Sequence, residues 1–159
     1  FKNCPGPQAM AKPKCVGRDA SLIAEAAGIA VPQSCRLLIV DVGRNIDHPF
    51  ARIEQMMPVL PVLRPQNVTE AIDWAFILER GLSHTAGMHS TNINNMDAMA
   101  RKMNTSLFVK NGPFIAGLGA GGEGWTSMTI STPTGEGVTN ARSFVRLRRC
   151  VLVDNFRIV

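Results

Sequence analysis

The stretch HTAGMHSTNINNMDAMARKMNTSLFVK, residues 84 to 110, decides the fold because it predicts a strand, a helix and a second strand in succession. Residues 84 to 89 and 105 to 110 are short apolar segments, which favours strands. Between them the segment Asn92 to Met103 has four apolar residues at helical spacing, namely Met96, Met99, Ala100 and Met103. Such a stripe is typical of core packing rather than of a cofactor site. A helix between two short strands indicates a crossover connection and a parallel sheet.

The same alternation extends toward the amino terminus. Val68 to Arg80 predicts the best helix, with Asn67 as its cap and an apolar face formed by Ile72, Ala75 and Phe76. Four further elements are predicted: a helix at Leu22 to Ala27, a buried strand at Arg36 to Val42, a short amphipathic piece at Pro49 to Glu54, and an edge or bent strand at Pro58 to Leu63. The sequence therefore predicts an α/β fold with a largely parallel sheet and crossover helices.

After residue 110 the character of the sequence changes. Residues 111 to 137 contain eight glycines and two prolines, which predicts a long loop. The cluster Gly117 to Gly124 resembles a phosphate-binding loop, but such a loop directly follows a strand and opens a helix. Here Asn111 to Pro113 intervene, and the residues after the cluster are typical of extended chain. We interpret the cluster as a structural loop and rank a phosphate- or CoA-binding module last among the functions.

Composition limits the classes of function. The 159 residues are 45% hydrophobic and only 18% charged, which indicates a folded domain whose surface is partly covered by other protein. The formal net charge is +5, but the absence of Tyr and the 6% of aromatic residues argue against nucleic-acid binding. No apolar run is long enough to span a membrane, and no signal peptide is apparent. The start in a loop without Met suggests a processed or incomplete chain.

Cysteines and histidines offer no reaction by themselves. The four cysteines, Cys4, Cys15, Cys35 and Cys150, form no CxxC pair, which indicates a reducing, cytoplasmic protein. The three histidines, His48, His84 and His89, have no partner at metal-ligand spacing, so no metal site is predicted. At the end of the chain, Ser143 to Val153 alternates imperfectly and carries arginines, which is typical of an exposed strand able to pair with another chain.

Several longer phrases, in a fixed order, carry a resemblance. They are Asp47–Phe50 (DHPF), Glu54–Val62 (EQMMPVLPV), His84–Ser90 (HTAGMHS), Phe108–Pro113 (FVKNGP), Ala116–Trp125 (AGLGAGGEGW), Thr132–Val138 (TPTGEGV) and Arg148–Asp154 (RRCVLVD). Together, from about Val16 to the end, they resemble the CoA-acylating aldehyde dehydrogenases of ethanolamine and propanediol utilisation. Residues 1–15, rich in Pro and Lys, are expected to form a loop, and the resemblance implies 16–140 as part of a catalytic domain and 141–159 as an oligomerisation strand region.

The resemblance also implies a reaction and its co-substrates. A cysteine thiolate attacks a short aldehyde, hydride passes to NAD, and CoA takes the acyl group from the thioester. The family's nucleophile and its nicotinamide-binding half precede the matched region, so no catalytic residue is assigned in this chain. We therefore expect the chain alone to be inactive. The implied partners are the remainder of the enzyme or identical chains in a homo-oligomer, and the implied location is the cytoplasm or the lumen of a bacterial microcompartment.

Four residues acquire expected roles through the resemblance. Glu54 matches the glutamate that holds the ribose hydroxyls of the nicotinamide nucleotide, and a carboxylate can accept two such hydrogen bonds. Met56 matches the residue that packs near the nicotinamide, and Phe114 and Ile115 lie where the family's loop lines the aldehyde pocket. Without the resemblance, Glu54 reads as a solvated surface residue. The alternative function is a non-catalytic assembly module that pairs through Val145 to Val153.

Overall fold

The computed structural model describes residues 10–122, 139, 141–149 and 153, and the chain forms two compact units, Phe1–Arg80 and Gly81–Val159. Each unit contains one pair of parallel strands joined by a helix. The predicted α/β class and the parallel pairing are therefore confirmed. The predicted domain boundaries stay predictions.

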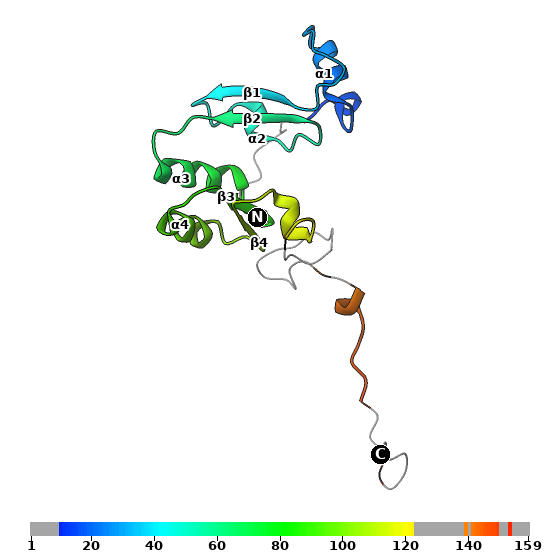
Figure 1. Cartoon of the computed structure of the whole chain (residues 1–159), viewed down its shortest axis with the longest axis vertical. Helices are drawn as coiled ribbons and strands as arrows, with labels where there is room; N and C mark the ends of the chain where they lie inside the picture. Colours follow the sequence, from blue (N-terminus) through cyan, green and yellow to red (C-terminus); the bar gives the residue numbers. More distant parts are fainter. Residues whose placement is uncertain (1–9, 123–138, 140, 150–152, 154–159) are drawn as a thin grey trace. The chain divides into compact units, whose positions relative to one another are not determined.

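The first unit is built around strands β1 (Leu38–Gly43) and β2 (Val59–Leu63), which lie side by side and parallel (Figure 1). Its other elements are the 3-10 turn η1 (Pro13–Cys15) and the helices α1 (Ala20–Ala26), α2 (Pro49–Arg52) and α3 (Val68–Glu79). Helix α2 connects the two strands and packs against both. The side chain of Asn67 caps α3 by accepting a hydrogen bond from the backbone N–H of Glu70, as the sequence predicts.

The core of the first unit is small. Ala20, Ala24, Val59 and Ile72 are buried. Phe76, predicted on the same apolar face of α3 as Ile72, is 48% exposed instead. On the sheet, Ile39 and Leu60 are paired in register and both are exposed, although parallel sheets are normally covered on both faces.

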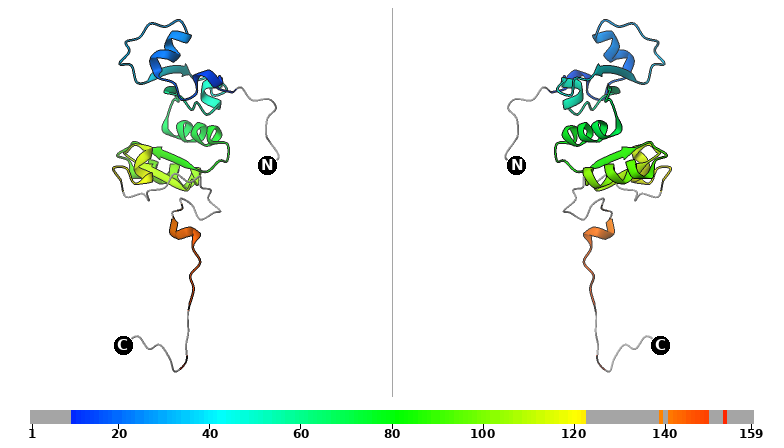
Figure 2. Two further views of the ribbon diagram at one scale, coloured as in Figure 1. Left: turned by 90° about the vertical axis from the view of Figure 1, so that its right-hand side faces the viewer. Right: turned by 90° about the vertical axis from the view of Figure 1, so that its left-hand side faces the viewer.

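The second unit repeats the strand–helix–strand pattern. Strands β3 (Thr85–Met88) and β4 (Leu107–Lys110) are parallel, and α4 (Ile93–Met103) packs on β3 (Figure 2). Asn92 caps α4 by accepting from the N–H groups of Asn94 and Asn95. Met99 and Met103 are buried together with Ala86 and Val109, so the methionine stripe forms core, as predicted.

The glycine-rich segment and the chain end contain only short turns among the described residues. The 3-10 turn η2 (Phe114–Leu118) lies within the predicted loop, and η3 (Ala141–Phe144) follows later. Residues 146–149 lie outside any helix or strand, and Leu147 is 92% exposed. Ser143 and Phe144, predicted to begin a strand, belong to η3 instead. The rest of the predicted strand, up to Val153, stays a prediction, since it requires a partner and residues 150–152 lie outside the described part. No described helix is long and apolar enough to cross a membrane.

Candidate functional site

The turn from Ile53 to Pro58, between α2 and β2, is held by polar contacts with the backbone. The side-chain amide of Gln55 donates to the carbonyl oxygens of Phe50 (2.8 Å) and Ile53 (3.0 Å). The N–H of Gly17 donates to the carbonyl of Met56 at 3.0 Å. Met56 has a φ of +49°, a left-handed conformation that costs energy for a side-chain-bearing residue. The surrounding hydrogen bonds therefore fix an unusual backbone at the predicted cofactor-contacting position.

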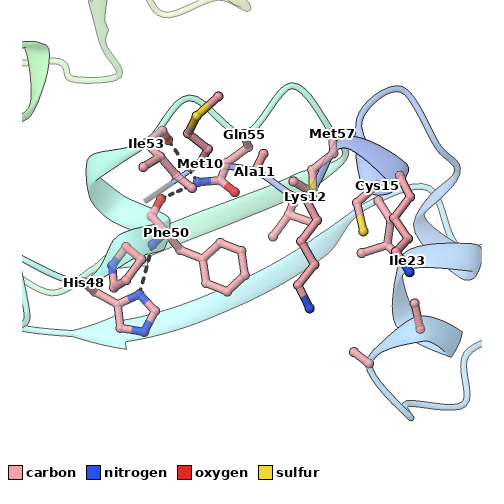
Figure 3. Close-up of a pocket in the computed structure, with 15 residues that line it drawn as sticks. Met10, Ala11, Lys12, Cys15, Ile23, His48, Phe50, Ile53, Gln55 and Met57 are labelled. Atoms are coloured by element: carbon pink, nitrogen blue, oxygen red, sulfur yellow. Dashed lines mark hydrogen bonds between the residues drawn. The ribbon is translucent and has the colours of Figure 1, made fainter. Parts of the chain in front are cut away.

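Side chains along this turn alternate in direction. The inward set lines a cavity of about 490 Å³ and consists of Ile53, Gln55 and Met57 (Figure 3), followed by Val59 of β2. Glu54 and Met56, which lie between them in the sequence, are exposed, and 63% of Met56 is accessible to solvent. The turn thus presents Glu54 and Met56 outward, while Ile53, Gln55 and Met57 line the cavity wall.

The remaining wall of the cavity comes from the amino-terminal segment and two helices. The lining residues are mostly apolar, with Lys12, Lys14 and His48 among them. His48 caps α2, since its Nδ1 accepts from the N–H of Phe50 at 3.2 Å, and its ring stacks on that of Phe50. Cys15 also lines the cavity as a free, half-buried thiol.

Glu54 differs from the acidic residues that stabilise the fold. Asp41, Asp47, Glu70 and Asp97 each form a salt bridge with an arginine. Glu54 makes no hydrogen bond or ion pair with any residue that the structure describes. A carboxylate without intrachain partners retains all its acceptor positions, so it can bind two hydroxyl groups.

A cluster of charges lies where β1 and β2 end. Arg64 contacts Asp41 at 2.6 Å, and its hydrogen bond lowers the pKa of that carboxyl group. Arg44 contacts Glu70 at 2.6 Å, lowers its pKa in the same way, and lies 5.1 Å from the centre of the Trp74 ring. Both guanidinium groups are thus engaged within the unit, which indicates a stabilising network rather than an anion site.

In the second unit the predicted pocket residues begin η2. Phe114 is 55% exposed, and Ile115 is exposed to a similar extent. The Phe114 ring lies over Gly87 of β3, since a Cβ built on Gly87 would be 2.5 Å from Phe114 Cε1. The loop that carries Phe114 is fixed to β3 by Asn111, whose side chain accepts from the N–H of Ser90 (2.7 Å) and donates to the Ser90 carbonyl (3.0 Å).

The four predicted site residues therefore fall into two pairs, Glu54 and Met56 in the first unit and Phe114 and Ile115 in the second. Sequence reasoning missed the residues that hold them, Gln55, Gly87 and Asn111. The phrases EQMM, HTAGMH and KNGP contain all three residues, but nothing in spacing alone indicates their contacts. Within residues 10–122, 139, 141–149 and 153, no group of three or more His, Cys, Asp or Glu could hold a metal ion.

Comparison with known proteins identifies relatives that are much longer than this chain. The acetaldehyde dehydrogenase (acetylating) of Bilophila wadsworthia is 80% identical over 147 residues, which are 92% of this chain and 30% of that protein. The propanal dehydrogenase (CoA-propanoylating) of Salmonella typhimurium is 52% identical over 153 residues, 96% of this chain and 32% of that protein. The chain thus spans about a third of the length of the curated relatives it matches. No family model matches it.

Solved structures agree with the sequence relatives. Propionaldehyde dehydrogenase from Rhodopseudomonas palustris, with bound propionyl-CoA, has a TM-score of 0.81 and 46% identity over 90% of this chain and 31% of that chain. An engineered glycolyl-CoA reductase with bound NADP+ also has a TM-score of 0.81, with 45% identity over 90% of this chain and 32% of that chain. Propionaldehyde dehydrogenase from the fucose utilisation microcompartment of Clostridium phytofermentans has a TM-score of 0.79 and 38% identity over 90% of this chain and 34% of that chain.

Proposed function

Since this chain is related in sequence and fold to the CoA-acylating aldehyde dehydrogenases, we propose that it supplies the nicotinamide-ribose contact and part of the aldehyde pocket of such an enzyme. The complete enzyme would convert a short aldehyde, CoA and NAD+ into acyl-CoA, NADH and a proton. The observation that carries the proposal is the anchored turn, which presents Glu54 without a partner among the described residues.

The residues of the turn suit a bound nicotinamide nucleotide. Glu54 would accept hydrogen bonds from the two ribose hydroxyls, and the polarisable thioether of Met56 would pack beside the nicotinamide ring. The cofactor supplies hydride acceptance when bound. The chain's own contribution is orientation: Gln55 and Gly17 hold the backbone of the turn, so that only the side chain of Glu54 has to be ordered on binding.

A chimeric enzyme tests this role. The matching segment of the Bilophila wadsworthia relative is replaced by this chain, and the rate of NADH formation from acetaldehyde and CoA is measured with and without Glu54→Gln. Hydrogen bonds to a charged acceptor contribute about 1.5–3 kcal/mol, so we expect the KM for NAD to rise roughly 10- to 100-fold. Glu25→Gln, at an exposed glutamate of α1, is the matched control. An unchanged KM for NAD in an active Glu54→Gln chimera would refute the role of Glu54.

The chain by itself is expected to form no NADH. The family's nucleophile is placed outside the matched segment, so this polypeptide cannot form the thioester that CoA attacks. Purified chain mixed with aldehyde, CoA and NAD should therefore show no increase in NADH absorbance. Turnover that persists in a Cys15→Ser variant would mean that another group of the chain acts as nucleophile, and turnover lost in that variant would identify Cys15.

The partners that we propose are the remainder of such an enzyme or identical chains. The exposed, paired Ile39 and Leu60 on the sheet support this proposal, because an apolar sheet face normally packs against another layer. Location in a bacterial microcompartment follows by analogy with the Clostridium phytofermentans relative and is likewise a proposal.

An assembly module is the second candidate function. Leu147 is 92% exposed in a stretch rich in arginine, which fits a segment that pairs with another chain. Light scattering at micromolar concentration should then show an oligomer that Leu147→Lys dissociates. A monomer would contradict the module, and an oligomer unaffected by the substitution would place its interface elsewhere.

A further inference from the structure

Gly87 lies at the middle of β3 directly beneath an aromatic ring. A Cβ built on Gly87 would be 2.5 Å from Cε1 and 3.3 Å from Cδ1 of Phe114, and 2.8 Å from the carbonyl oxygen of Val109. Side chains do not approach one another this closely, so any larger residue at position 87 must displace the ring. The glycine is therefore required here by close approach rather than by backbone conformation.

Phe114 stands at the start of a defined turn. Pro113 precedes it, η2 begins with it, and the strand pairing places Gly87 opposite Val109. Asn111 ties the same loop to the end of β3 through Ser90. One side of the ring rests on Gly87, and 55% of the residue is still exposed. The exposed part is available to a ligand, while the covered part sets how far the ring reaches from the sheet.

We propose that Phe114 determines the length of aldehyde that this site accepts and that Gly87 is its positioning residue. This proposal rests on the proposed function, in which Phe114 lines the aldehyde pocket. A phenyl ring seated close to the strand occupies the volume that the chain of a longer aldehyde would need. Removal of the ring opens that volume, and a methyl group at position 87 moves the ring without contacting the substrate.

The chimeric enzyme described above provides the first test. The measured quantity is the ratio of kcat/KM for pentanal to that for acetaldehyde. Each methylene accommodated in an apolar pocket changes kcat/KM by about 10-fold or more, so Phe114→Ala should raise the ratio at least 10-fold. Gly87→Ala should also change the ratio, without any contact with the aldehyde. Gly112→Ala is the matched control, because its new Cβ would meet nothing closer than 3.7 Å. The proposal would be overturned if Phe114→Ala and Gly87→Ala, in an active chimera, leave the ratio at the value of the Gly112→Ala control.

The second test uses this chain itself and does not depend on activity. Gly87→Ala should lower the midpoint of thermal unfolding by about 5 °C, since overpacking a well-packed position is destabilising. In a Phe114→Ala background the same substitution should lower the midpoint by clearly less, and only the contact with the Val109 carbonyl should remain. Equal losses in the two backgrounds would show that Phe114 does not rest on Gly87. A chimera inactive toward every aldehyde would refute the proposed function, and this cycle would then decide the Gly87–Phe114 contact alone.

Discussion

In the first unit the four residues of α2 connect β1 to β2, whereas in the second unit the eleven residues of α4 connect β3 to β4. The longer helix buries Met99 and Met103 and so completes a small core by itself. In the first unit, by contrast, the exposed pair Ile39 and Leu60 is left on the sheet. Two similar strand–helix–strand patterns thus differ in how much of their own sheet they bury.

The two units also hold their candidate site residues by different means. In the first unit, hydrogen bonds from Gln55 and Gly17 fix the turn that presents Glu54. In the second unit, Phe114 is held by packing on Gly87, while Asn111 fixes the loop before it. The turn that carries the charged group is thus held by hydrogen bonds, and the apolar ring is held by packing. Substitutions of these supporting residues test whether a loss of stability in one unit extends to the other.

The largest effect is expected from Asn111→Ala. The substitution removes both hydrogen bonds to Ser90 and places alanine at a φ of +54°, which together should cost about 2 kcal/mol of the free energy of unfolding. Hydrogen exchange followed by mass spectrometry should show faster exchange in residues 85–122 and unchanged exchange in residues 38–63.

Asn104→Ala is the control for that experiment. Asn104 also has a left-handed φ, of +47°, at the end of α4, but its side chain does not join two strands. It should therefore show the conformational cost without loosening β3 and β4 at their carboxyl ends. Faster exchange in residues 38–63 of the Asn111→Ala variant would contradict a loss confined to the second unit.

A somewhat smaller effect is expected from Gln55→Ala in the first unit. The variant loses the hydrogen bonds to the carbonyls of Phe50 and Ile53. It also removes the Gln55 Oε1 atom, which is buried without a hydrogen-bond partner in the described part of the chain, so part of the loss is offset. We expect a net cost of about 1–2 kcal/mol. Urea unfolding is followed by Trp74 fluorescence in a Trp125→Phe background, with exposed Gln33→Ala as the control. Equal midpoints for the two variants would mean that Gln55 does not hold the turn.

The sequence predicted the elements better than the contacts within them. The helix at Asn92 to Met103 follows from hydrophobic periodicity, and the cap at Asn67 follows from local hydrogen bonding. Both depend on residues close together in the sequence, so the sequence alone predicts them. Two contacts could not be predicted in this way: the hydrogen bonds between Asn111 and Ser90, and the packing of Phe114 on Gly87. Both join residues far apart in the sequence and depend on strand register. The exposure of Phe76 was missed because an apolar face on a helix shows a capacity to pack and does not show what covers it.

The smallest expected effect concerns pH and the charges at the end of the first sheet. The hydrogen bond from Arg44 lowers the pKa of Glu70 below its ordinary value of 4.5, and the backbone N–H of Gln66 acts in the same direction. Because the folded pKa lies below the unfolded one, this contribution to stability is present above pH 4.5 and is lost as the pH falls through the folded pKa. The urea midpoint of the parent chain should therefore fall more steeply than that of Glu70→Gln between about pH 5 and pH 3. The Asp41–Arg64 pair is present in both chains, so the difference reports Glu70 alone. Added salt should reduce this difference in the pH dependence of the urea midpoint, since the Arg44–Glu70 pair is partly exposed. Parallel pH profiles of the two chains at low salt would show that the Arg44–Glu70 contact adds nothing to the stability of the unit.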